Sequence, residues 1–543
     1  MEQNYRVSES DRQAIEKRRT FAIISHPDAG KTTLTEKLLL YGGAIVEAGM
    51  VKGKKNMRHA VSDWMEIEKQ RGISVTSSVM QFKYNGYCIN ILDTPGHQDF
   101  SEDTYRTLMA ADSAVMVIDG SKGVEAQTRK LFKVCRMRGI PIFTFINKMD
   151  REARDSFDLM ADIEDNLGIE TCPINWPIGS GKSFQGVYDR LNRKMLKFMS
   201  DGSDIGSAVS GAHEIDQISI ELDDPKLGDI IGQGPLDQLK EEIDLLDGAG
   251  HELDMDMVRK GELSPVFFGS ALTNFGVEPF LKEFLNMTTS PLPRQAQEEV
   301  VEPFDSRMTG FVFKIQANMN KAHRDRAAFI RICSGVYEKG MQVYHTQEGK
   351  TIRLSQPTQL MAQDRSIVDK AWAGDIISVF DPGIFSIGDT ICDPSHVIHY
   401  EGIPTFAPEH FCRLRPEDSL KRKQFIKGTS EIAQEGAIQV FKEPEGGMEE
   451  VIIGVVGTLQ FDVMQFRLKT EYNVDVRMEM LPYEHIRWMT SSDMDPKELT
   501  LTSDTKVVMD MKDHYLLLFA SDWNIDWALK HNPGLELAEF SRG

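Results

Sequence analysis

The sequence predicts a multidomain protein that starts with an α/β domain, continues with an antiparallel β-barrel and ends with an α+β third domain. Its 543 residues exceed the usual size of a single domain. Up to about residue 290, apolar runs alternate with helical segments, which is typical of a doubly wound, mostly parallel sheet. After residue 304 the pattern changes to short alternating strands with glycine turns, which is typical of a small barrel.

We therefore expect three domains, over residues 1–290, 304–400 and 405–543. The region at about 151–262 is acidic and less regular, so we interpret it as an insertion in the first domain. The segment from about residue 500 onward shows no motif, and we expect a C-terminal tail there.

The composition narrows the class of protein. A net charge of −21, from 62 Lys+Arg against 83 Asp+Glu, argues against a protein that coats nucleic acid. The six cysteines stand singly, so we expect free thiols in the cytoplasm and neither a zinc site nor a disulfide framework. The N-terminus lacks the apolar core of a signal peptide, and no apolar run reaches the ~20 residues of a membrane helix. We expect a monomer that binds neither DNA nor a membrane.

The first motif is the loop "SHPDAGKTT", which lies between the expected strand "TFAIIS" and the helical segment "TTLTEKLLL". Ser25 replaces the first glycine of the phosphate-loop pattern G-x-x-x-x-G-K-[ST]. Gly30 permits a close approach, Lys31 can reach outer phosphates, and the Thr32 hydroxyl can bind magnesium. The alternative is an ordinary threonine-rich helix N-cap. The candidate phosphate-binding residues are Ser25, His26, Pro27, Asp28, Ala29, Gly30, Lys31, Thr32 and Thr33.

A second segment with similar letters, "IGSGKS" at 178–183, does not fit the same pattern. Trp176 stands where the first glycine is required, and we expect no strand directly before the segment. We therefore interpret it as a surface loop.

The motif "DTPGH" follows the expected strand "YCINIL". Asp93 can hold a magnesium ion through water, and Gly96 can turn its N–H onto a terminal phosphate and release it when that phosphate leaves. His97 can position a water molecule. The alternative is an ordinary turn. The candidate residues are Asp93, Thr94, Pro95, Gly96 and His97.

The motif "NKMD" also follows an expected strand, and "GSAL" at 269–272 follows another. The Asp150 carboxylate can accept two hydrogen bonds from the N1–H and N2–H₂ edge of guanine, whereas adenine has no such donor pair. The alternative is an aspartate that caps a helix. The candidate base-binding residues are Asn147, Lys148, Met149, Asp150, Ser270, Ala271 and Leu272.

The four motifs occur in the order phosphate loop, D-x-x-G, N-K-x-D and S-A, each after an expected strand. In a doubly wound sheet the ligand lies at the carboxyl ends of the strands, so we expect one shared site. The combination is the pattern of a P-loop domain for guanine nucleotides, and it predicts GTP and GDP with Mg²⁺ as ligands. An ATP-dependent kinase or ATPase is the alternative for the phosphate loop alone, and Asp150 argues against it.

The segments "DAGKTTLTEKLL", "EKQRGISVTSS", "DTPGHQDF" and "NKMD" resemble the translational GTPases, in particular the elongation factor G subgroup. The third domain is similar too, in "GTLQFDVMQFRLKTEYNVDV", and the resemblance covers about 20–490. It implies that Ser74, where members usually have threonine, binds magnesium in the GTP state. It also implies that His97 is the catalytic histidine, assisted by Lys31 and Gly96 at the phosphates.

The resemblance implies a GTPase that the bacterial ribosome activates. The loop "SHPDAGKTT" and the early end of the chain are most similar to the subgroup member that acts in termination, where codon-reading (class I) release factors are recycled after peptide release. The expected partners are the ribosome, with its RNA and proteins, and the class I release factors bound to it. The alternatives are another subgroup member, in elongation, ribosome protection or back-translocation, and a GTP-binding regulatory switch that binds no ribosome.

Overall fold

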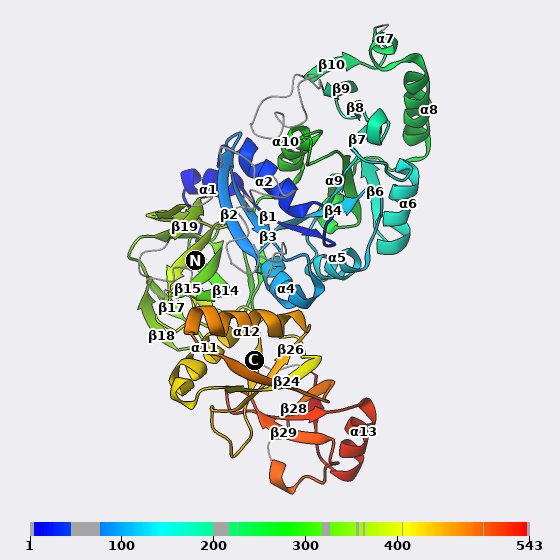
Figure 1. The fold of residues 1–543 in the computed structure, drawn as a ribbon. Helices are drawn as coiled ribbons and strands as arrows, with labels where there is room; N and C mark the ends of the chain where they lie inside the picture. The colour runs from blue at the N-terminus through cyan, green and yellow to red at the C-terminus, as the bar shows by residue number, and fades with distance from the viewer. Residues whose placement is uncertain are drawn as a thin grey trace.

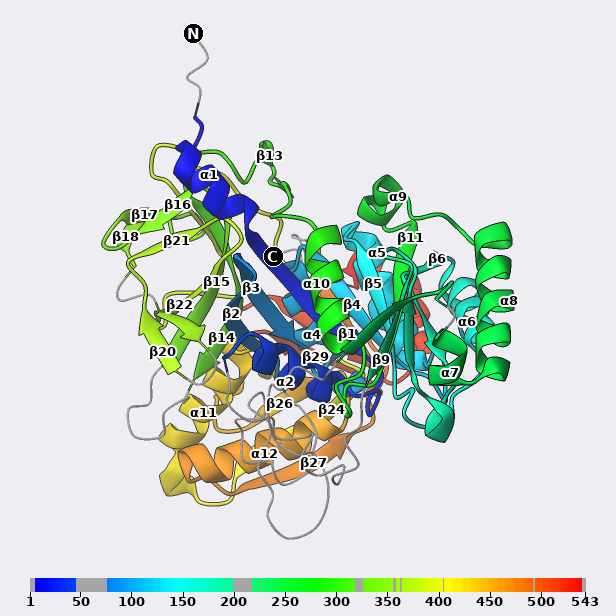
Figure 2. The same ribbon diagram turned by 90° about the horizontal axis from the view of Figure 1, so that it is seen from above.

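The computed structural model shows an α/β unit, an antiparallel barrel and an α+β unit, which confirms the predicted fold class (Figures 1 and 2). The barrel lies beside the α/β unit, and the third unit lies below both in the view of Figure 1. The structure describes residues 5–44, 76–198, 217–224, 226–317, 326–354, 358–361, 364–403, 405–491 and 494–539.

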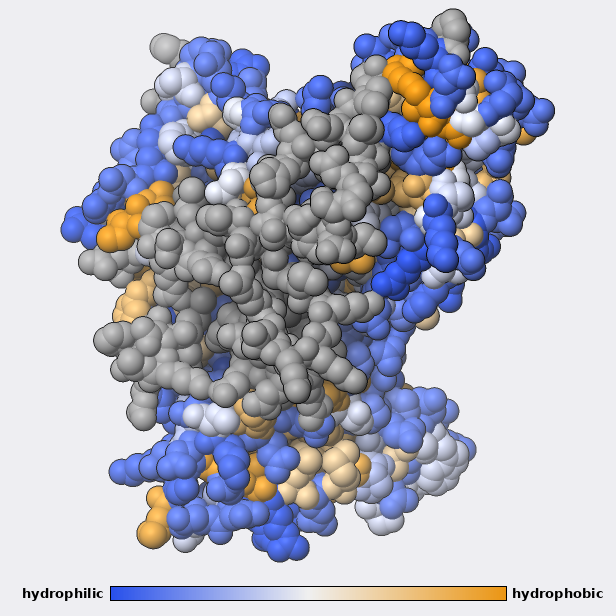
Figure 3. Space-filling model, turned by 45° about the horizontal axis from the view of Figure 1, so that its top comes forward, coloured by the Kyte–Doolittle hydropathy of each residue, from blue (hydrophilic) through white to orange (hydrophobic). Residues whose placement is uncertain are grey.

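The face of the molecule shown in Figure 3 is mainly polar where its residues are described. On the face shown in Figure 3, most described residues are hydrophilic, and the hydrophobic ones form small separate patches. Within the described ranges, no helix has both the length and the apolar character that crossing a membrane requires.

The central sheet of the α/β unit is parallel except at one edge, where β2 runs antiparallel to β3. Strands β1 and β4 are buried along their whole length because helices cover both faces, which explains why they are continuous apolar runs in the sequence. The strand order is β2 (Ser78–Tyr84), β3 (Tyr87–Asp93), β1 (Arg18–Ser25), β4 (Ser113–Asp119), β5 (Ile142–Asn147), β11 (Leu263–Phe268) and β6 (Glu170–Pro173).

Two hydrophobic cores lie on opposite faces of this sheet, because alternate side chains of each strand point in opposite directions. Ala22 and Ile24 join one core, whereas Phe21 and Ile23 join the other. The first core is covered by α4 (Ser101–Met109), α5 (Ala126–Arg138) and α6 (Ser156–Leu167). The second core is covered by α2 (Lys31–Tyr41), α9 (Met255–Lys260) and α10 (Val277–Met287).

The region expected as an insertion is divided between the central sheet and a small sheet of its own. Helix α6 and strand β6 belong to the central sheet, because β6 pairs in parallel with β11. Trp176 is buried under the small sheet's helix α8, where its Nε1 donates to Glu242 at 2.6 Å. Figures 1 and 2 both place α8 on the side of the α/β unit that faces away from the barrel. The small sheet consists of β7 (Asn175–Ile178), β8 (Gly186–Asp189), β9 (Lys194–Phe198) and β10 (Gln217–Glu221), and the helices that follow it are α7 (Leu227–Ile231) and α8 (Gln233–Ala249).

One expectation for the segment "IGSGKS" is wrong, because strand β7 leads directly into it and ends at its first residue, Ile178. The segment still differs from a phosphate loop on its C-terminal side. It forms the single 3-10 turn η2 (Gly181–Ser183), which Ser180 caps, and the chain then enters strand β8 without a helix. A phosphate loop needs a helix N-terminus at this point.

The barrel consists of antiparallel strands around its own hydrophobic core. Its strands are β14 (Thr309–Ala317), β15 (Arg326–Ser334), β17 (Gln342–His345), β18 (Lys350–Arg353), β19 (Thr358–Met361), β20 (Asp364–Ile367), β22 (Ile376–Phe380) and β23 (Thr390–Cys392). A further antiparallel pair, β16 (Val336–Glu338) and β21 (Lys370–Trp372), adjoins them. The N-terminal helix α1 (Glu9–Glu16) is held at this pair, where Trp372 Nε1 donates to Asp11 at 2.8 Å.

Buried ion pairs fix the barrel to the α/β unit. Arg18 of β1 pairs with Asp375 at 2.8 Å, and Arg331 of β15 pairs with Asp112 at 2.5 Å. All four side chains are less than 10% exposed. Removing one partner of such a pair leaves a buried charge uncompensated, which typically costs about 3–5 kcal/mol. These contacts therefore favour a single orientation of the two units.

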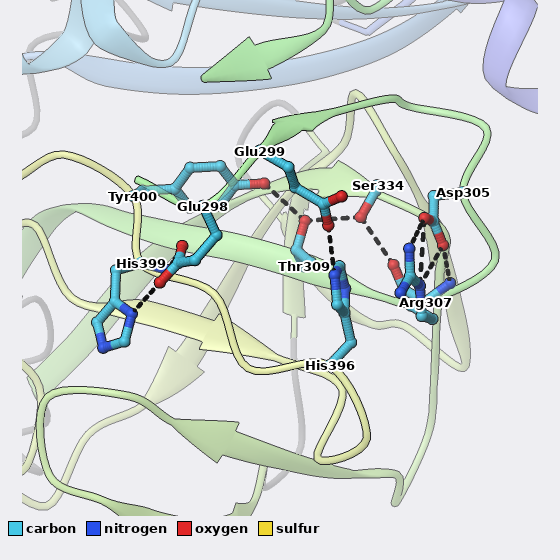
Figure 4. A network of polar contacts seen from close by, with 9 residues as sticks. All are labelled: Glu298, Glu299, Asp305, Arg307, Thr309, Ser334, His396, His399 and Tyr400. Carbon is cyan, nitrogen blue, oxygen red and sulfur yellow. Dashed lines mark hydrogen bonds and ion pairs between the residues drawn. The ribbon is translucent and has the colours of Figure 1, made fainter. Parts of the chain in front are cut away.

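The linker between the α/β unit and the barrel is held against the end of the barrel (Figure 4). It contains the short pair β12 (Arg294–Gln295) and β13 (Val300–Val301). Between these strands, Glu298 pairs with His399 at 2.6 Å and Glu299 pairs with His396. The linker thus follows a defined path across the barrel.

The third unit contains two four-stranded sheets. The first, covered by helices α11 (Arg422–Gln434) and α12 (Leu459–Tyr472), has the order β25 (Gln439–Phe441), β26 (Val451–Val455), β24 (His410–Pro416) and β27 (Val476–Leu481). The second, with helix α13 (Asp522–His531), has the order β29 (Thr505–Met509), β30 (Tyr515–Phe519), β28 (His485–Met489) and β31 (Leu537–Ala538). Short 3-10 turns, η3 (Ser419–Lys421) and η4 (Pro496–Glu498), connect the elements. The described residues beyond 500 are therefore part of a packed sheet, although the sequence shows no motif there.

Candidate active site

The phosphate-loop residues lie at the carboxyl end of β1 and lead directly into α2. Asp28 and Gly30 both have left-handed backbones, with φ of 66° and 98°. A Cβ added to Gly30 would lie 2.2 Å from Asn147 Nδ2, so glycine is required there for steric as well as conformational reasons. Ser25 is the last residue of β1 and is buried in extended backbone, so this position accepts a side chain.

Lys31 forms a buried ion pair with Asp93 in this structure. The distance from Lys31 Nζ to Asp93 Oδ1 is 2.5 Å, and the two side chains are 6% and 2% exposed. Thr35 Oγ1 also lies 3.4 Å from the same carboxylate oxygen. The phosphate-loop cation and the carboxylate of "DTPGH" are thus in direct contact, as expected for residues of one site. Thr32 and Thr33 are half-buried in the first turn of α2.

The "DTPGH" turn is held against the phosphate loop. Thr94 Oγ1 donates to the carbonyl of Ile23 in β1 at 2.7 Å. A Cβ on Gly96 would lie 3.5 Å from Pro27 Cα, so the two loops touch at this point. His97 follows as the N-cap of the 3-10 turn η1 (Gln98–Phe100), and its side chain is 38% exposed.

Asn147 connects the phosphate loop to the loop after β11. Its Nδ2 donates to the carbonyl of Ala29 at 2.9 Å, and its Oδ1 accepts from the Ala271 N–H at 2.9 Å. Asp150 Oδ1 accepts from the Ser270 hydroxyl at 2.6 Å. Met149 N–H donates to the carbonyl of Gly269 at 3.1 Å, which holds the two base-side loops together.

The structure brings together the predicted site residues that it describes. Ser74 lies outside the described residues. Leu272, which follows the Ala271 contact, is 44% exposed.

Two acidic residues that the motifs did not include also belong to this edge of the sheet. Asp119, the last residue of β4, accepts from Lys148 Nζ at 2.6 Å. Burial tends to raise the pKa of Asp119, but hydrogen bonds from Lys148 and Ser121 outweigh it and hold the pKa below its usual range. Asp99 contacts His97, with 3.1 Å between Oδ1 and Nδ1. The strand end at Asp119 was a usable signal in the sequence, whereas Asp99 carried none.

The oxygen ligands at this edge fit a hard cation such as Mg²⁺. Within the ranges that the structure describes, no group of three or more His, Cys, Asp and Glu side chains could hold a metal ion by itself. The Thr32 hydroxyl and the Asp93 carboxylate supply oxygen atoms next to the phosphate loop. Mg²⁺ is commonly bound by few protein oxygens, together with phosphate oxygens and water.

Comparisons with known proteins match each of the three units. The model for the elongation factor Tu GTP binding domain matches residues 16–290, the model for elongation factor G domain 2 matches 307–394, and the model for the class II release factor RF3 C-terminal domain matches 400–529. A crystal structure from Thermus thermophilus shares the fold, with a TM-score of 0.67 and 21% identity over 89% of this chain and 71% of that one.

Full-length relatives are closer in sequence. Peptide chain release factor 3 of Symbiobacterium thermophilum is 58% identical over 521 residues, which cover 96% of this chain and 97% of that protein. Peptide chain release factor 3 of Listeria monocytogenes serotype 4b is 52% identical over 537 residues, covering 98% and 99%. The predicted resemblance is thereby confirmed. The chain belongs to the peptide chain release factor 3 family, and it is a translational GTPase that acts in termination.

Proposed function

We propose that the ribosome activates this GTPase and that its GTP cycle removes class I release factors from the bacterial ribosome after peptide release. One observation carries the proposal. The phosphate loop, the Asp150 carboxylate and the accessible His97 lie at one edge of a single sheet, in a chain of the release factor 3 family.

Asp150 would read the guanine base. The Ser270 hydroxyl, 2.6 Å from Asp150 Oδ1, holds the carboxylate beside the backbone of Ala271. A carboxylate in this position can accept from both N1–H and N2–H₂ of guanine. An adenine nucleotide offers no such pair of donors, and a carboxylate that loses this pairing inside the base pocket costs binding energy.

Lys31 would change partners when the nucleotide binds. It pairs with Asp93 in the present structure, and the phosphates would supply a stronger negative charge in the same place. Thr32, Asp93 and, in the GTP state, Ser74 would hold Mg²⁺, which neutralises negative charge on the phosphates. Gly96 would contact the γ-phosphate through its N–H and lose that contact on hydrolysis.

His97 would orient the attacking water. Phosphoryl transfer depends mainly on positioning and on neutralising charge, so a correctly placed imidazole matters more than its basicity. The side chain is 38% exposed, which leaves it accessible to a ribosomal surface. We expect slow hydrolysis by the free protein, since activating partners of other GTPases raise the rate by roughly 10³–10⁵-fold.

The protein would act on the ribosome through a change of conformation and would not hydrolyse peptidyl-tRNA itself. Release factors that hydrolyse peptidyl-tRNA resemble one another in a Gly-Gly-Gln triplet, and the sequence has none, because its two Gly-Gly pairs precede Ala44 and Met448. The GTP form would bind the ribosome state that holds class I factors poorly. By linkage it would then weaken their binding.

A reconstituted termination assay tests the proposal. With limiting class I factor, adding this protein and GTP should raise multiple-turnover peptide release and leave the first turnover unchanged. Peptide release by this protein alone would contradict the proposal, and so would stimulation that persists in Lys31→Ala.

We further propose that the protein acts as a monomer in the cytoplasm, with domains over residues 1–290, 304–400 and 405–543. The barrel and the third unit each have a hydrophobic core of their own, which supports this division, while the core on one face of the central sheet also includes Phe311 and Phe329 of the barrel. Six cysteines without a disulfide among the described residues are in keeping with a reducing compartment.

A further inference from the structure

Asp99 lies between the expected catalytic histidine and the third unit. Its Oδ1 is 3.1 Å from His97 Nδ1, and its own N–H is 3.3 Å from the same nitrogen, which either donates to the carboxylate or accepts from the N–H. Its Oδ2 accepts from the backbone N–H of Leu459 at 2.8 Å, 360 residues further along the chain. The Asp99 side chain is only 9% exposed. One buried carboxylate therefore contacts both His97 and the third unit.

The third unit is shaped to receive this carboxylate. Leu459 is the first residue of helix α12, where backbone N–H groups have no partner within the helix and attract negative charge. A Cβ on Gly457 would lie 2.1 Å from Asp99 Cγ, and the three nearest atoms to it all belong to Asp99. Gly457 is thus small where Asp99 needs the room.

The contact also determines which way the imidazole points. With Nδ1 directed toward Asp99, Nε2 on the opposite side of the ring is directed away from it. If the carboxylate moved with α12, the ring would lose the group that holds its Nδ1 edge. A displacement of about 1 Å at a reacting group can change a rate by about 10²-fold.

Other contacts hold the same junction without touching His97. Arg106 of α4 donates to the carbonyl of Gly436 at 3.1 Å. Glu435 accepts from Arg467 of α12 at 2.7 and 2.9 Å and from the Ala317 N–H of the barrel at 3.0 Å. Glu435 therefore offers a matched control, since it is a buried carboxylate at the same junction.

We propose that Asp99 is a positioning residue that makes the orientation of His97 depend on where the third unit sits. The inference rests on the proposed role of His97 in hydrolysis. In this arrangement, a partner that shifts α12 alters GTP hydrolysis without contacting the nucleotide. The ribosome can then couple its own conformation to the timing of hydrolysis through the third unit.

The test uses the full-length protein and measures ribosome-stimulated GTP hydrolysis, separating kcat from the KM for ribosomes. Asp99→Ala should lower kcat by at least about tenfold and leave KM and GDP affinity within about threefold, because misplacing His97 affects only the reaction step. Asp99→Asn keeps an oxygen for the Leu459 N–H and the size of the side chain, so it should recover most of the lost kcat. If Asp99→Ala proves unstable, Gly457→Ala carries the test, because it breaks the same contact from the third unit.

Two further variants test whether the loss of kcat arises at the contact between Asp99 and the third unit. Gly457→Ala, made entirely in the third unit, should lower kcat as Asp99→Ala does, because the added methyl displaces the carboxylate. The kcat of the double variant, Asp99→Ala with Gly457→Ala, should lie within about threefold of the lower of the two single-variant kcat values. Both changes break the same contact, so their effects should not add. Glu435→Gln keeps a side-chain oxygen for Arg467 and Ala317, so α12 should stay in place and kcat should remain within about threefold of the parent.

The outcomes separate the inference from the proposed function. If His97→Ala hydrolyses GTP on ribosomes at the parent rate, His97 has no role and both ideas fail. If His97→Ala is inactive but Asp99→Ala keeps the parent kcat, only the inference is wrong. An equal loss of kcat in Glu435→Gln would also overturn it, because the effect would then belong to the junction as a whole.

Discussion

Asn147 should be the residue whose removal most directly separates the two halves of the nucleotide site. Its amide is buried and joins the phosphate loop, through Ala29, to the base-side loop, through Ala271, with both distances at 2.9 Å. Asn147→Ala deletes both hydrogen bonds at once. It also leaves a buried carbonyl and a buried N–H without their partner.

The magnitude follows from these two contacts. Each hydrogen bond contributes about 0.5–1.5 kcal/mol, and each polar group left unpaired costs about 1–3 kcal/mol. Allowing for partial entry of water, we expect a total loss of about 2–4 kcal/mol, shared between folding and nucleotide binding. If half of it appears in binding, the Kd for GDP rises by about 5–30-fold, at 1.4 kcal/mol for each factor of ten.

Equilibrium titration with a fluorescent GDP analogue measures the binding part, and urea unfolding of the nucleotide-free protein measures the folding part. Thr144→Val is the matched control. Thr144 lies in the same strand and shares a buried hydroxyl contact of 2.8 Å with Ser264. The control should lose stability and keep its GDP affinity within about twofold. Equal GDP affinity in Asn147→Ala and the parent would refute the reasoning, and so would an equal loss in the control.

Three further predictions concern the site and the thiols. Asp150→Asn should weaken GTP binding and gain affinity for xanthosine triphosphate, because the amide offers a donor where xanthine has a carbonyl. A competition titration measures both affinities, and unchanged GTP affinity would exclude Asp150 as the residue that recognises the base. Lys31→Ala should weaken nucleotide binding itself, whereas His97→Ala should bind normally and lose only ribosome-stimulated hydrolysis; filter binding beside a turnover assay distinguishes the two, and the reverse pattern would exchange their roles. Burial raises the pKa of three thiols to about 12, so these thiols stay protonated at pH 8. They should react with iodoacetamide far more slowly in the native protein than in guanidinium. Equal labelling rates in the two conditions would show that they are accessible thiolates. These thiols are Cys88, Cys135 and Cys412.

The candidate nucleotide site could be predicted from the sequence because each of its parts is local. A buried strand, a turn with Gly30 and a helix beginning at Lys31 are consecutive in the chain, and their backbone chemistry depends on neighbouring residues. The same holds for "DTPGH" after β3 and "NKMD" after β5. The rule that ligands lie at the carboxyl ends of parallel strands then placed these segments together.

The small-sheet region and the C-terminal region were harder to predict. Strand β6 becomes part of the central sheet only because β11 lies beside it, and no local pattern distinguishes it from the insertion that comes after it. Strand β29 is a five-residue segment whose partners are β30 and, through a single bridge, Lys442. Short strands carry little periodicity, so their pairing decides their structure.

The sequence by itself determined the order of the motifs, the nucleotide they suit and the three kinds of fold. Only the tertiary structure decided which side chains meet: Lys31 with Asp93, Asn147 with Ala29 and Ala271, and Asp99 with Leu459. The physical reason is the range of the interactions. Turn and helix chemistry acts over a few residues, whereas a hydrogen bond across 360 residues forms only when two separately packed units bring its donor and acceptor together.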